Sequence, residues 1–337
     1  MTYFLNAFSL MSPTWVIEDI IIYVIAGAFI FYLLRQYPGR APYLLLEFGA
    51  FVFLYASVYE NLAVTIMHYY SYGPSLIMIG NTPLSIPLFE AVVFLGSLTL
   101  FERLRLPVWS WPIFAGWFAV IQDLSLDPAS VSQIFPVAES VSGRWQWLIV
   151  KPGMASMFNE PAFNFTGWMI MMVYAAVCLL LGRWWFKKSG ENPIVGVIYP
   201  LLGMVGALLL LVSPLSLFLL WLAPVFTQGS VAEWIMLGVY LIAPLALLAI
   251  LWRKIGHLSF KDAWPLAAPF ILFLLSDIVF TIVGAHWNVL WIVLTASIVH
   301  TAILLAILLR ARSVSAPAET RAPTEDAPAL IVEPQSV

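Results

Sequence analysis

Residues 162–186 read AFNFTGWMIMMVYAAVCLLLGRWWF, a run in which Arg183 is the only charged side chain. A helix needs about 20 mainly apolar residues to cross the hydrocarbon core of a bilayer, because lipid offers no partner for unpaired backbone groups. This run is long and apolar enough, so it predicts a membrane-spanning helix. The chain repeats the pattern on both sides of it.

The composition also indicates a membrane protein. Of the 337 residues, 62% are hydrophobic and 10% are charged, whereas about a quarter of the residues of a soluble protein are charged. We therefore expect an all-α, polytopic bundle of eight or nine spans, of which the sixth is the weakest because Pro200 and Pro214 can kink or break it. The nine predicted spans are residues 16–34, 43–67, 84–101, 107–127, 162–186, 194–222, 231–252, 265–284 and 288–309.

Lysine and arginine residues predict the orientation, because loops rich in them stay in the cytoplasm. Only Arg144 and Lys151 fall on one side of the predicted spans, so we expect the N-terminus outside and the C-terminus in the cytoplasm. Residues 1–312 then form one domain in the cell membrane, and residues 313–337, which lack an apolar period, form a disordered tail. The thirteen basic residues on the other side are Arg35, Arg40, Arg103, Arg105, Arg183, Lys187, Lys188, Arg253, Lys254, Lys261, Arg310, Arg312 and Arg321.

Residue counts exclude several classes of protein. A single cysteine, Cys178, excludes a disulfide framework and a cysteine metal cluster. The net charge of −3 gives no electrostatic footprint for nucleic acid. The other histidines fall in predicted loops, which leaves His300 without a second ligand for haem or a metal ion. We expect no cofactor and no metal.

Acidic and amide side chains gather near one end of the predicted spans. An ionisable group inside a membrane costs several kcal/mol unless it is paired or hydrated, so each such residue predicts a functional site. In the predicted topology they lie in the outer third of the bilayer. They are Glu60 and Asn61 in the second span, Glu90 in the third, Asp123 and Asp127 in the fourth, and Asn159, Glu160 and Asn164 at the start of the fifth.

Structural roles compete with functional ones for these residues. Asp123 and Asp127 are four apart and share a helical face, but Asp127 precedes Pro128 and can simply end the helix while Asp123 bonds a neighbouring helix. Glu60 can be a protonated acid that bonds across helices. Glu90 follows a proline pair and can satisfy backbone groups freed by a kink.

Other polar residues suggest structural roles. Asp277 and His300 lie deep in the last two spans, where we expect them to pair with each other as a structural bond or as a proton relay. Four acidic residues lie near the ends of predicted spans, where their side chains are expected to reach water. They are Glu18, Asp19, Glu47 and Glu102.

Aromatic residues are interleaved with the polar group. An interfacial aromatic belt explains many of them, but it explains Trp117 and Trp168 less well, because these two lie further into helices. An aromatic pocket that contains carboxylic acids suits carbocation chemistry: a neutral acid protonates an alkene, and each ring face stabilises the cation by about 0.5–2 kcal/mol. The aromatic residues are Trp109, Trp111, Trp117, Trp145, Trp147, Phe163, Phe165, Trp168, Tyr69, Tyr70 and Tyr72.

Several motifs follow one another in a specific order between residues 50 and 175. They are Glu60, Tyr72-Gly73, Pro83-Leu84-Ser85-Ile86-Pro87, Asp123-Leu124-Ser125-Leu126-Asp127-Pro128, Trp145 and Pro161-Ala162-Phe163-Asn164-Phe165-Thr166-Gly167-Trp168. The most specific of them are the DLxLDP run and the PxxNxxGW run. In this order the motifs resemble the membrane carotenoid biosynthesis proteins that include carotenoid 1,2-hydratases and bisanhydrobacterioruberin hydratase.

The resemblance implies addition of water across the terminal double bond of an acyclic carotenoid, without redox chemistry. The partners would be a lipophilic isoprenoid, water, the bilayer and other carotenoid biosynthesis enzymes. We expect Asp127 or Glu60 to deliver the proton, with Asp123 as a further catalytic carboxyl. The residues expected to bind substrate are Asn164, Trp168, Trp145, Glu90, Tyr72, Phe163 and Trp117.

The chain also departs from the family pattern. The stretch between Asp127 and Pro161 is long, and Met157-Phe158-Asn159-Glu160 stands where an aromatic-Gly-Val element is expected. The same cation can be captured by water, lose a proton or cyclise, so a cyclase or an isomerase stays open as an alternative.

Two other functions compete with the hydratase. Asp123-x-x-x-Asp127 resembles half of an aspartate-rich magnesium motif of membrane prenyltransferases, but a second such motif and nearby basic residues are not evident. A transporter or assembly factor would use intramembrane acids for proton coupling, although a convincing internal repeat is also not evident.

Overall fold

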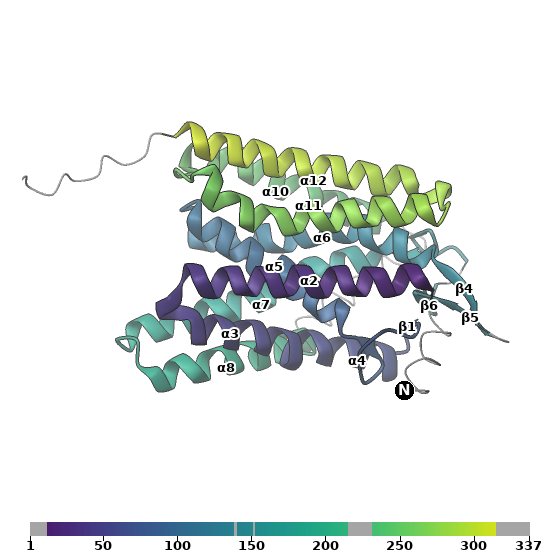
Figure 1. Cartoon of the computed structure of the whole chain (residues 1–337), viewed down its shortest axis with the longest axis horizontal. Helices are drawn as coiled ribbons and strands as arrows, with labels where there is room; N and C mark the ends of the chain where they lie inside the picture. The colour runs from purple at the N-terminus through teal and green to yellow at the C-terminus, as the bar shows by residue number, and fades with distance from the viewer. Residues whose placement is uncertain (1–11, 138–139, 151, 215–230, 315–337) are drawn as a thin grey trace, which may run out of the picture.

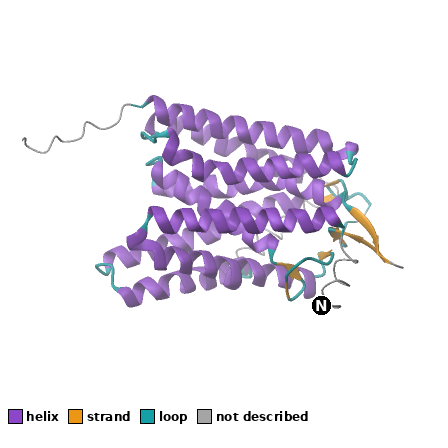
Figure 2. Ribbon diagram, viewed as in Figure 1, coloured by secondary structure: helices purple, strands orange, loops and turns teal. Residues whose placement is uncertain are grey.

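The computed structural model describes residues 12–137, 140–150, 152–214 and 231–314. Within that part, long helices lie side by side in a bundle, and the labelled strands collect at one end of it (Figure 1). Figure 2 shows the strands at this end in orange and the helices that make up the rest of the bundle in purple. We call this the strand end of the bundle. The expected all-α architecture is confirmed, and the predicted tail lies almost entirely outside the described residues.

Eight helical segments among the described residues are long and apolar enough to cross a membrane, which agrees with a multi-pass membrane protein. Each overlaps a predicted span. The segments are α2 (Pro13–Gln36), the composite segment Pro38–Thr65, α5 (Ser85–Arg103), α7 (Ala162–Lys188), α8 (Pro193–Leu211), α10 (Val231–Leu251), α11 (Phe260–Val283) and α12 (Trp287–Ser313).

Helix α8 is shorter than the predicted sixth span. Pro200 lies inside the helix, which ends at Leu211, before Pro214. Its start follows the expected chemistry, since the Asn192 side chain accepts a 2.9 Å hydrogen bond from the backbone nitrogen of Ile194. Most of the predicted stretch beyond Leu211 falls outside the described residues.

Helix α6 (Trp111–Val131) corresponds to the predicted fourth span and lies at the centre of the bundle. It packs against α5, α7, α11 and α12, and nearly all of its side chains are buried. Neighbouring helices therefore surround its polar residues. The helix continues through Pro128, so the interpretation in which Asp127 simply ends the helix is wrong.

The composite segment changes its winding just before it reaches Glu60. It comprises η1 (Pro38–Arg40), α3 (Ala41–Ala50), the π-helical η2 (Phe51–Ala56) and α4 (Ser57–Thr65). The Ser57 hydroxyl donates a 2.7 Å hydrogen bond to the carbonyl of Val52, and the Tyr55 hydroxyl donates a 2.8 Å bond to the carbonyl of Met171 in α7. Such wide turns are rare and occur often at functional sites.

The described residues include eight short strands, all in antiparallel pairs, which the sequence analysis did not anticipate. The pair of β1 and β6 aligns Tyr70 with Trp147 and Tyr72 with Trp145. We call these two strands the cap. The pairs are β1 (Tyr70–Tyr72) with β6 (Trp145–Trp147), β2 (Met78–Ile79) with β3 (Thr82–Pro83), β4 (Ile134–Val137) with β5 (Ser140–Gly143), and β7 (Ser156–Met157) with β8 (Glu160–Pro161).

Asn61 holds the β2–β3 hairpin rather than a substrate site. Its Nδ2 donates a 2.9 Å hydrogen bond to the carbonyl of Ile79, and its Oδ1 accepts a 2.8 Å bond from the nitrogen of Asn81. Gly80 has a φ of 62°, and a Cβ there would lie 2.3 Å from Asn61 Oδ1. Only glycine fits this turn without displacing Asn61.

Buried ion pairs correct one group of expectations. Glu18 and Asp19 of α2 are buried against Arg144, and Glu47 is buried against Arg183 of α7 with Oε2–Nη2 at 2.6 Å. The expectation that these three acids reach water is therefore wrong. Each is buried with a basic partner, because an unpaired charge inside a protein costs several kcal/mol. Glu102, by contrast, keeps a partly exposed side chain.

Asp277 and His300 do not make the expected pair. His300 Nδ1 lies 3.2 Å from Nε2 of Gln122 in α6. The Asp277 side chain hydrogen-bonds to Ser125, which also belongs to α6. Both residues therefore tie α11 and α12 to α6.

Candidate active site

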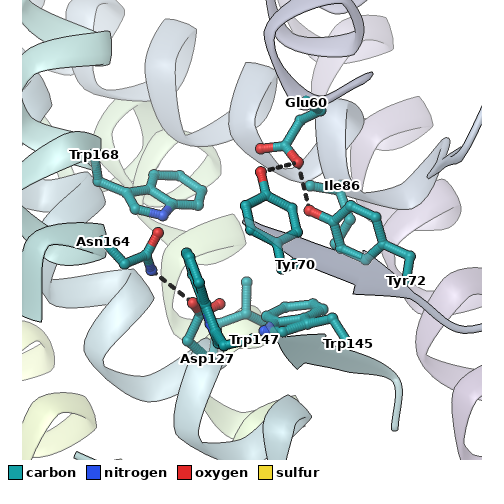
Figure 3. A pocket seen from close by; sticks show the side chains of 10 residues that line it. Glu60, Tyr70, Tyr72, Ile86, Asp127, Trp145, Trp147, Asn164 and Trp168 are labelled. Atoms are coloured by element: carbon teal, nitrogen blue, oxygen red, sulfur yellow. Dashed lines mark hydrogen bonds between the residues drawn. The ribbon is translucent and has the colours of Figure 1, made fainter. Parts of the chain in front are cut away.

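The strand end encloses a small cavity walled by rings and carboxyls (Figure 3). Counted out to its open side, its empty space is about 320 Å³, of which about 20 Å³ is wide enough for the centre of a water molecule. The lining comes from α4, β1, α5, α6, β6 and α7, so segments distant in the sequence meet there. We call it the aromatic cavity. Its lining residues are Glu60, Tyr70, Tyr72, Ile86, Leu126, Asp127, Trp145, Trp147, Asn164 and Trp168.

The cap supplies the aromatic wall and binds Glu60. Alternate residues of a strand point to the same face, so β1 presents two tyrosines and β6 two tryptophans. The hydroxyls of Tyr70 and Tyr72 donate to Glu60 Oε2 at 2.8 and 2.5 Å. Tyr70 packs on Trp147 with ring centroids 4.7 Å apart, and Tyr72 packs on Trp145 at 5.8 Å. Burial raises the pKa of Tyr72 well above its usual range, so the phenol keeps its proton and remains a donor.

Glu90 of α5 lies behind Glu60 rather than on the wall. It accepts a hydrogen bond from Tyr59, and its carboxyl contacts that of Glu60. Glu90 is fully buried, and one of its oxygens has no partner among the described residues.

Three carboxyls surround the amide of Asn164. Its Nδ2 lies 2.9 Å from Asp123 Oδ2, 2.6 Å from Asp127 Oδ2 and 2.7 Å from Glu160 Oε1. Asp123 and Asp127 project from one face of α6, as their spacing predicts, while Glu160 arrives from β8. The side chain of Asp127 also contacts those of Asp123 and Glu160. Of the three, only Asp127 lines the aromatic cavity.

The carboxyls of the site lie next to one another without basic partners. Among the described residues, no Lys, Arg or His forms an ion pair with Glu60, Glu90, Asp123, Asp127 or Glu160. Adjacent buried carboxyls cannot all be ionised, because each negative charge disfavours the next. Burial, and then the neighbouring Asp127, raises the pKa of Glu160 well above its usual range. This direction favours the protonated form of Glu160, which can donate a hydrogen bond.

Asp123, Asp127 and Glu160 are also the described residues whose type and spacing come closest to a metal site, with ligand atoms within 4.8 Å of one another. However, Asn164 directs its NH₂ group, a donor, toward all three. A cation would need an acceptor there. We therefore interpret these residues as a hydrogen-bonded group of acids.

An apolar groove leads to the aromatic cavity along α4 and α7, as far as the end of α8. Its empty space, counted out to the open mouth, is about 1140 Å³. The two spaces are adjacent, because both are lined by Glu60, Tyr70, Trp147, Asn164 and Trp168. We call this space the lateral groove. Its remaining lining residues are Tyr59, Leu62, Ala63, Met67, Tyr69, Phe163, Gly167, Ile170, Met171, Leu211 and Val212.

Most of the residues expected at the site line either the aromatic cavity or the lateral groove. Glu60, Tyr72, Asp127, Trp145, Asn164 and Trp168 line the aromatic cavity, and Phe163 lines the lateral groove. Asp123 and Glu90 line neither space, although each contacts a carboxyl that does. Trp117 lines neither space, because it packs in the core between Phe114 and Phe118 with centroids 6.3 and 5.8 Å away.

Sequence analysis did not assign three residues of the site a role in it. Glu160 was grouped only with the polar residues, and Tyr70 and Trp147 only with the aromatic ones. The alternation in Tyr70-Ser71-Tyr72 and Trp145-Gln146-Trp147 is the signal that could have identified the two rings, since it places aromatic residues on one face of a strand.

No family model, curated protein or solved structure matches this chain.

Proposed function

We propose that this protein is a membrane hydratase that adds water to the terminal double bond of an acyclic carotenoid or a related isoprenoid. One observation carries the proposal: buried carboxyls without basic partners and indole rings line a cavity that adjoins an apolar groove. The resemblance of residues 50–175 to carotenoid hydratases supports the same chemistry. Carotenoid-modifying enzymes are then the expected source of its substrate.

The proposed reaction begins at Asp127. Its carboxyl gives a proton to the less substituted carbon of the terminal double bond, and the carbon that carries two methyl groups becomes a tertiary carbocation. Water attacks the cation, and the resulting oxonium returns a proton to a carboxylate of the cavity, which restores the acid. Alkene and water are consumed, one tertiary alcohol forms, and no electrons are exchanged. Asp123 supports Asp127 through the shared Asn164 amide.

The walls of the aromatic cavity contain groups that can stabilise the carbocation and groups that can bind water or the product alcohol. Trp145, Trp147 and Trp168 present ring faces that stabilise a cation by about 0.5–2 kcal/mol each. The indole nitrogen of Trp147 is buried and has no partner among the described residues, so it has a hydrogen bond to offer to water or to the product hydroxyl. Glu60, held by two tyrosines, is the second carboxyl positioned to orient water.

The lateral groove suits a long apolar substrate. Its walls are mainly aliphatic and aromatic, and the carboxyls lie at its inner end. A polyene can therefore lie in the groove with most of its length in lipid while one end group enters the aromatic cavity. A carotenoid is about as long as the hydrocarbon core is thick, so its end reaches an interface where water is available.

The proposal includes a topology. We place the N-terminus outside and the C-terminus in the cytoplasm, with α6 as a ninth, central span and the site on the extracytoplasmic side. The basic residues support this arrangement, because only Arg144 and Lys151 belong to the strand-end connections.

The test is expression in cells that make lycopene, with pigment mass as the measurement. The wild-type chain should yield a product heavier by one water, and Asp127→Asn should abolish it because the amide has no acid proton to give. Glu191→Gln, an exposed position outside the site, is the matched control and should retain activity. Unchanged pigment with the wild-type chain contradicts the proposal, and a new product of unchanged mass identifies a cyclase or isomerase instead.

A further inference from the structure

Glu160 is presented by a turn with an unfavourable backbone. Strands β7 and β8 pair Met157 with Glu160, which leaves Phe158 and Asn159 as a two-residue loop. Their φ angles are 55° and 65°, the left-handed pattern of the tightest hairpin turns. Asparagine tolerates that conformation, but phenylalanine rarely adopts it and is strained there. The Phe158 ring packs near Trp291 of α12, with centroids 6.0 Å apart, and this contact holds the turn.

The turn delivers Glu160 to Asp127. Glu160 is fully buried, its Oε1 lies 2.7 Å from Asn164 Nδ2, and its side chain contacts that of Asp127. Its second oxygen has no hydrogen-bond partner among the described residues. The groups that face it are Asp123 and Asp127 from α6 and Asn164 from α7, while β7 contributes no titratable side chain.

We propose that Glu160 is a positioning residue that keeps its own proton and donates it as a hydrogen bond to Asp127, which makes Asp127 a stronger acid. This inference rests on the proposed hydration. When Asp127 gives its proton to the alkene, the resulting carboxylate accepts the Glu160 hydrogen bond, and no proton leaves Glu160. The proton that Asp127 loses is replaced by one from the attacking water, so the step balances.

The strained turn fits this role better than a purely structural one. A hairpin selected only for stability would carry Asn-Gly or Gly-Gly at these positions. Backbone strain of this kind persists where the surroundings hold it in place, and it clusters at functional sites. Here it fixes a neutral acid against the residue that must lose a proton.

The first experiment compares Glu160→Gln and Glu160→Ala with the wild-type chain in the lycopene assay across pH. The glutamine NH₂ still donates a hydrogen bond, so Glu160→Gln should retain part of the rate, whereas Glu160→Ala should lose about 10–100-fold, the effect of one hydrogen bond to a charged group. In Glu160→Ala the alkaline limb of the pH–rate profile should move to higher pH, because the Asp127 carboxylate has lost its donor.

A structural role predicts a different result. If Glu160 only supported the fold, the rate would fall with the alkaline limb unmoved, and the proposal would be overturned. Asn159→Gly, which keeps the left-handed turn and leaves the Glu160 side chain unchanged, is the control and should retain both rate and profile.

A second measurement does not depend on turnover. The infrared spectrum of the purified chain at pH 7 should contain a protonated-carboxyl C=O band that disappears in Glu160→Gln and shifts in Asp127→Asn. Absence of this band overturns the inference. A wild-type chain that shows the band but hydrates nothing supports the shared hydrogen bond and overturns the proposed function, so the two failures are distinguishable.

Discussion

Glu60 accepts both tyrosine hydrogen bonds on the same oxygen, Oε2, while Glu90 lies against its carboxyl. Two donors stabilise negative charge on that oxygen, so the carboxyl is suited to accept a hydrogen bond from the attacking water and orient it. Asp127, by contrast, contacts two other acids. The two carboxyls of the aromatic cavity therefore differ in environment, which is how a site separates an acid from a base.

Removing one donor from Glu60 should slow the reaction. In Tyr72→Phe the ring remains against Trp145, but the 2.5 Å hydrogen bond is lost. We expect a fall in kcat of about tenfold, since a bond to a charged group contributes about 1.5–3 kcal/mol and Tyr70 remains as a donor. Initial rates of alcohol formation provide the measurement. Tyr69→Phe, whose hydroxyl bonds to none of the described residues, is the matched control, and equal losses in both variants would contradict this role.

Among the elements, the cap is joined to the bundle by a buried polar link. Arg144 precedes β6 and lies against Glu18 and Asp19 of α2, while its carbonyl accepts a 2.9 Å bond from the nitrogen of Gly73, next to β1. Gln133 completes the link with a 2.8 Å bond to Glu18. The cap carries half of the aromatic wall, so this link also fixes the cavity.

Breaking that link should destabilise the chain. Arg144→Met leaves Glu18 and Asp19 buried without a basic partner, which costs about 3–5 kcal/mol. The thermal midpoint in detergent should fall at pH 7 and recover partly at acidic pH, because protonated Glu18 and Asp19 carry no unpaired charge. Arg40→Met is the control, since its pair with Glu102 has side chains 38% and 34% exposed and contributes about 0–1 kcal/mol. Equal shifts in both variants would refute the buried link.

At the scale of the whole molecule, the bundle has two unlike ends. The strand end holds the site carboxyls, the cap and Arg144. The last turn of α7, which contains Lys187 and Lys188, lies at the other end (Figure 1). This asymmetry is what the charge distribution predicts for a chain inserted in one orientation.

Thiol labelling tests that orientation. In a Cys178→Ser background, Pro152→Cys and Lys187→Cys place single thiols at exposed positions near the two ends. A membrane-impermeant maleimide should label Pro152→Cys on intact cells and Lys187→Cys only after permeabilisation. The opposite pattern would invert the topology and place the site at the cytoplasmic face, whereas labelling of both on intact cells would contradict the assumed spans.

The sequence by itself determined the class of fold and the helical segments. Segments such as 162–186 cannot be hydrated or left without backbone partners, so length and composition suffice to predict them. The spacing of Asp123 and Asp127 likewise fixed a shared face, because a helix repeats every 3.6 residues. These features depend on neighbours along the chain.

Tertiary structure alone decided which side chains meet. The six-residue π-helical η2, the pairing of β1 with β6 and the left-handed turn at Phe158 each contact distant segments, so no local pattern specified them. For the same reason Trp117 was assigned to the site and lies in the core, while Glu160 and Trp147 acquired their places beside Asp127 only on folding. Whether a buried residue faces a cavity or a neighbouring helix depends on packing across the bundle, which one sequence does not encode position by position.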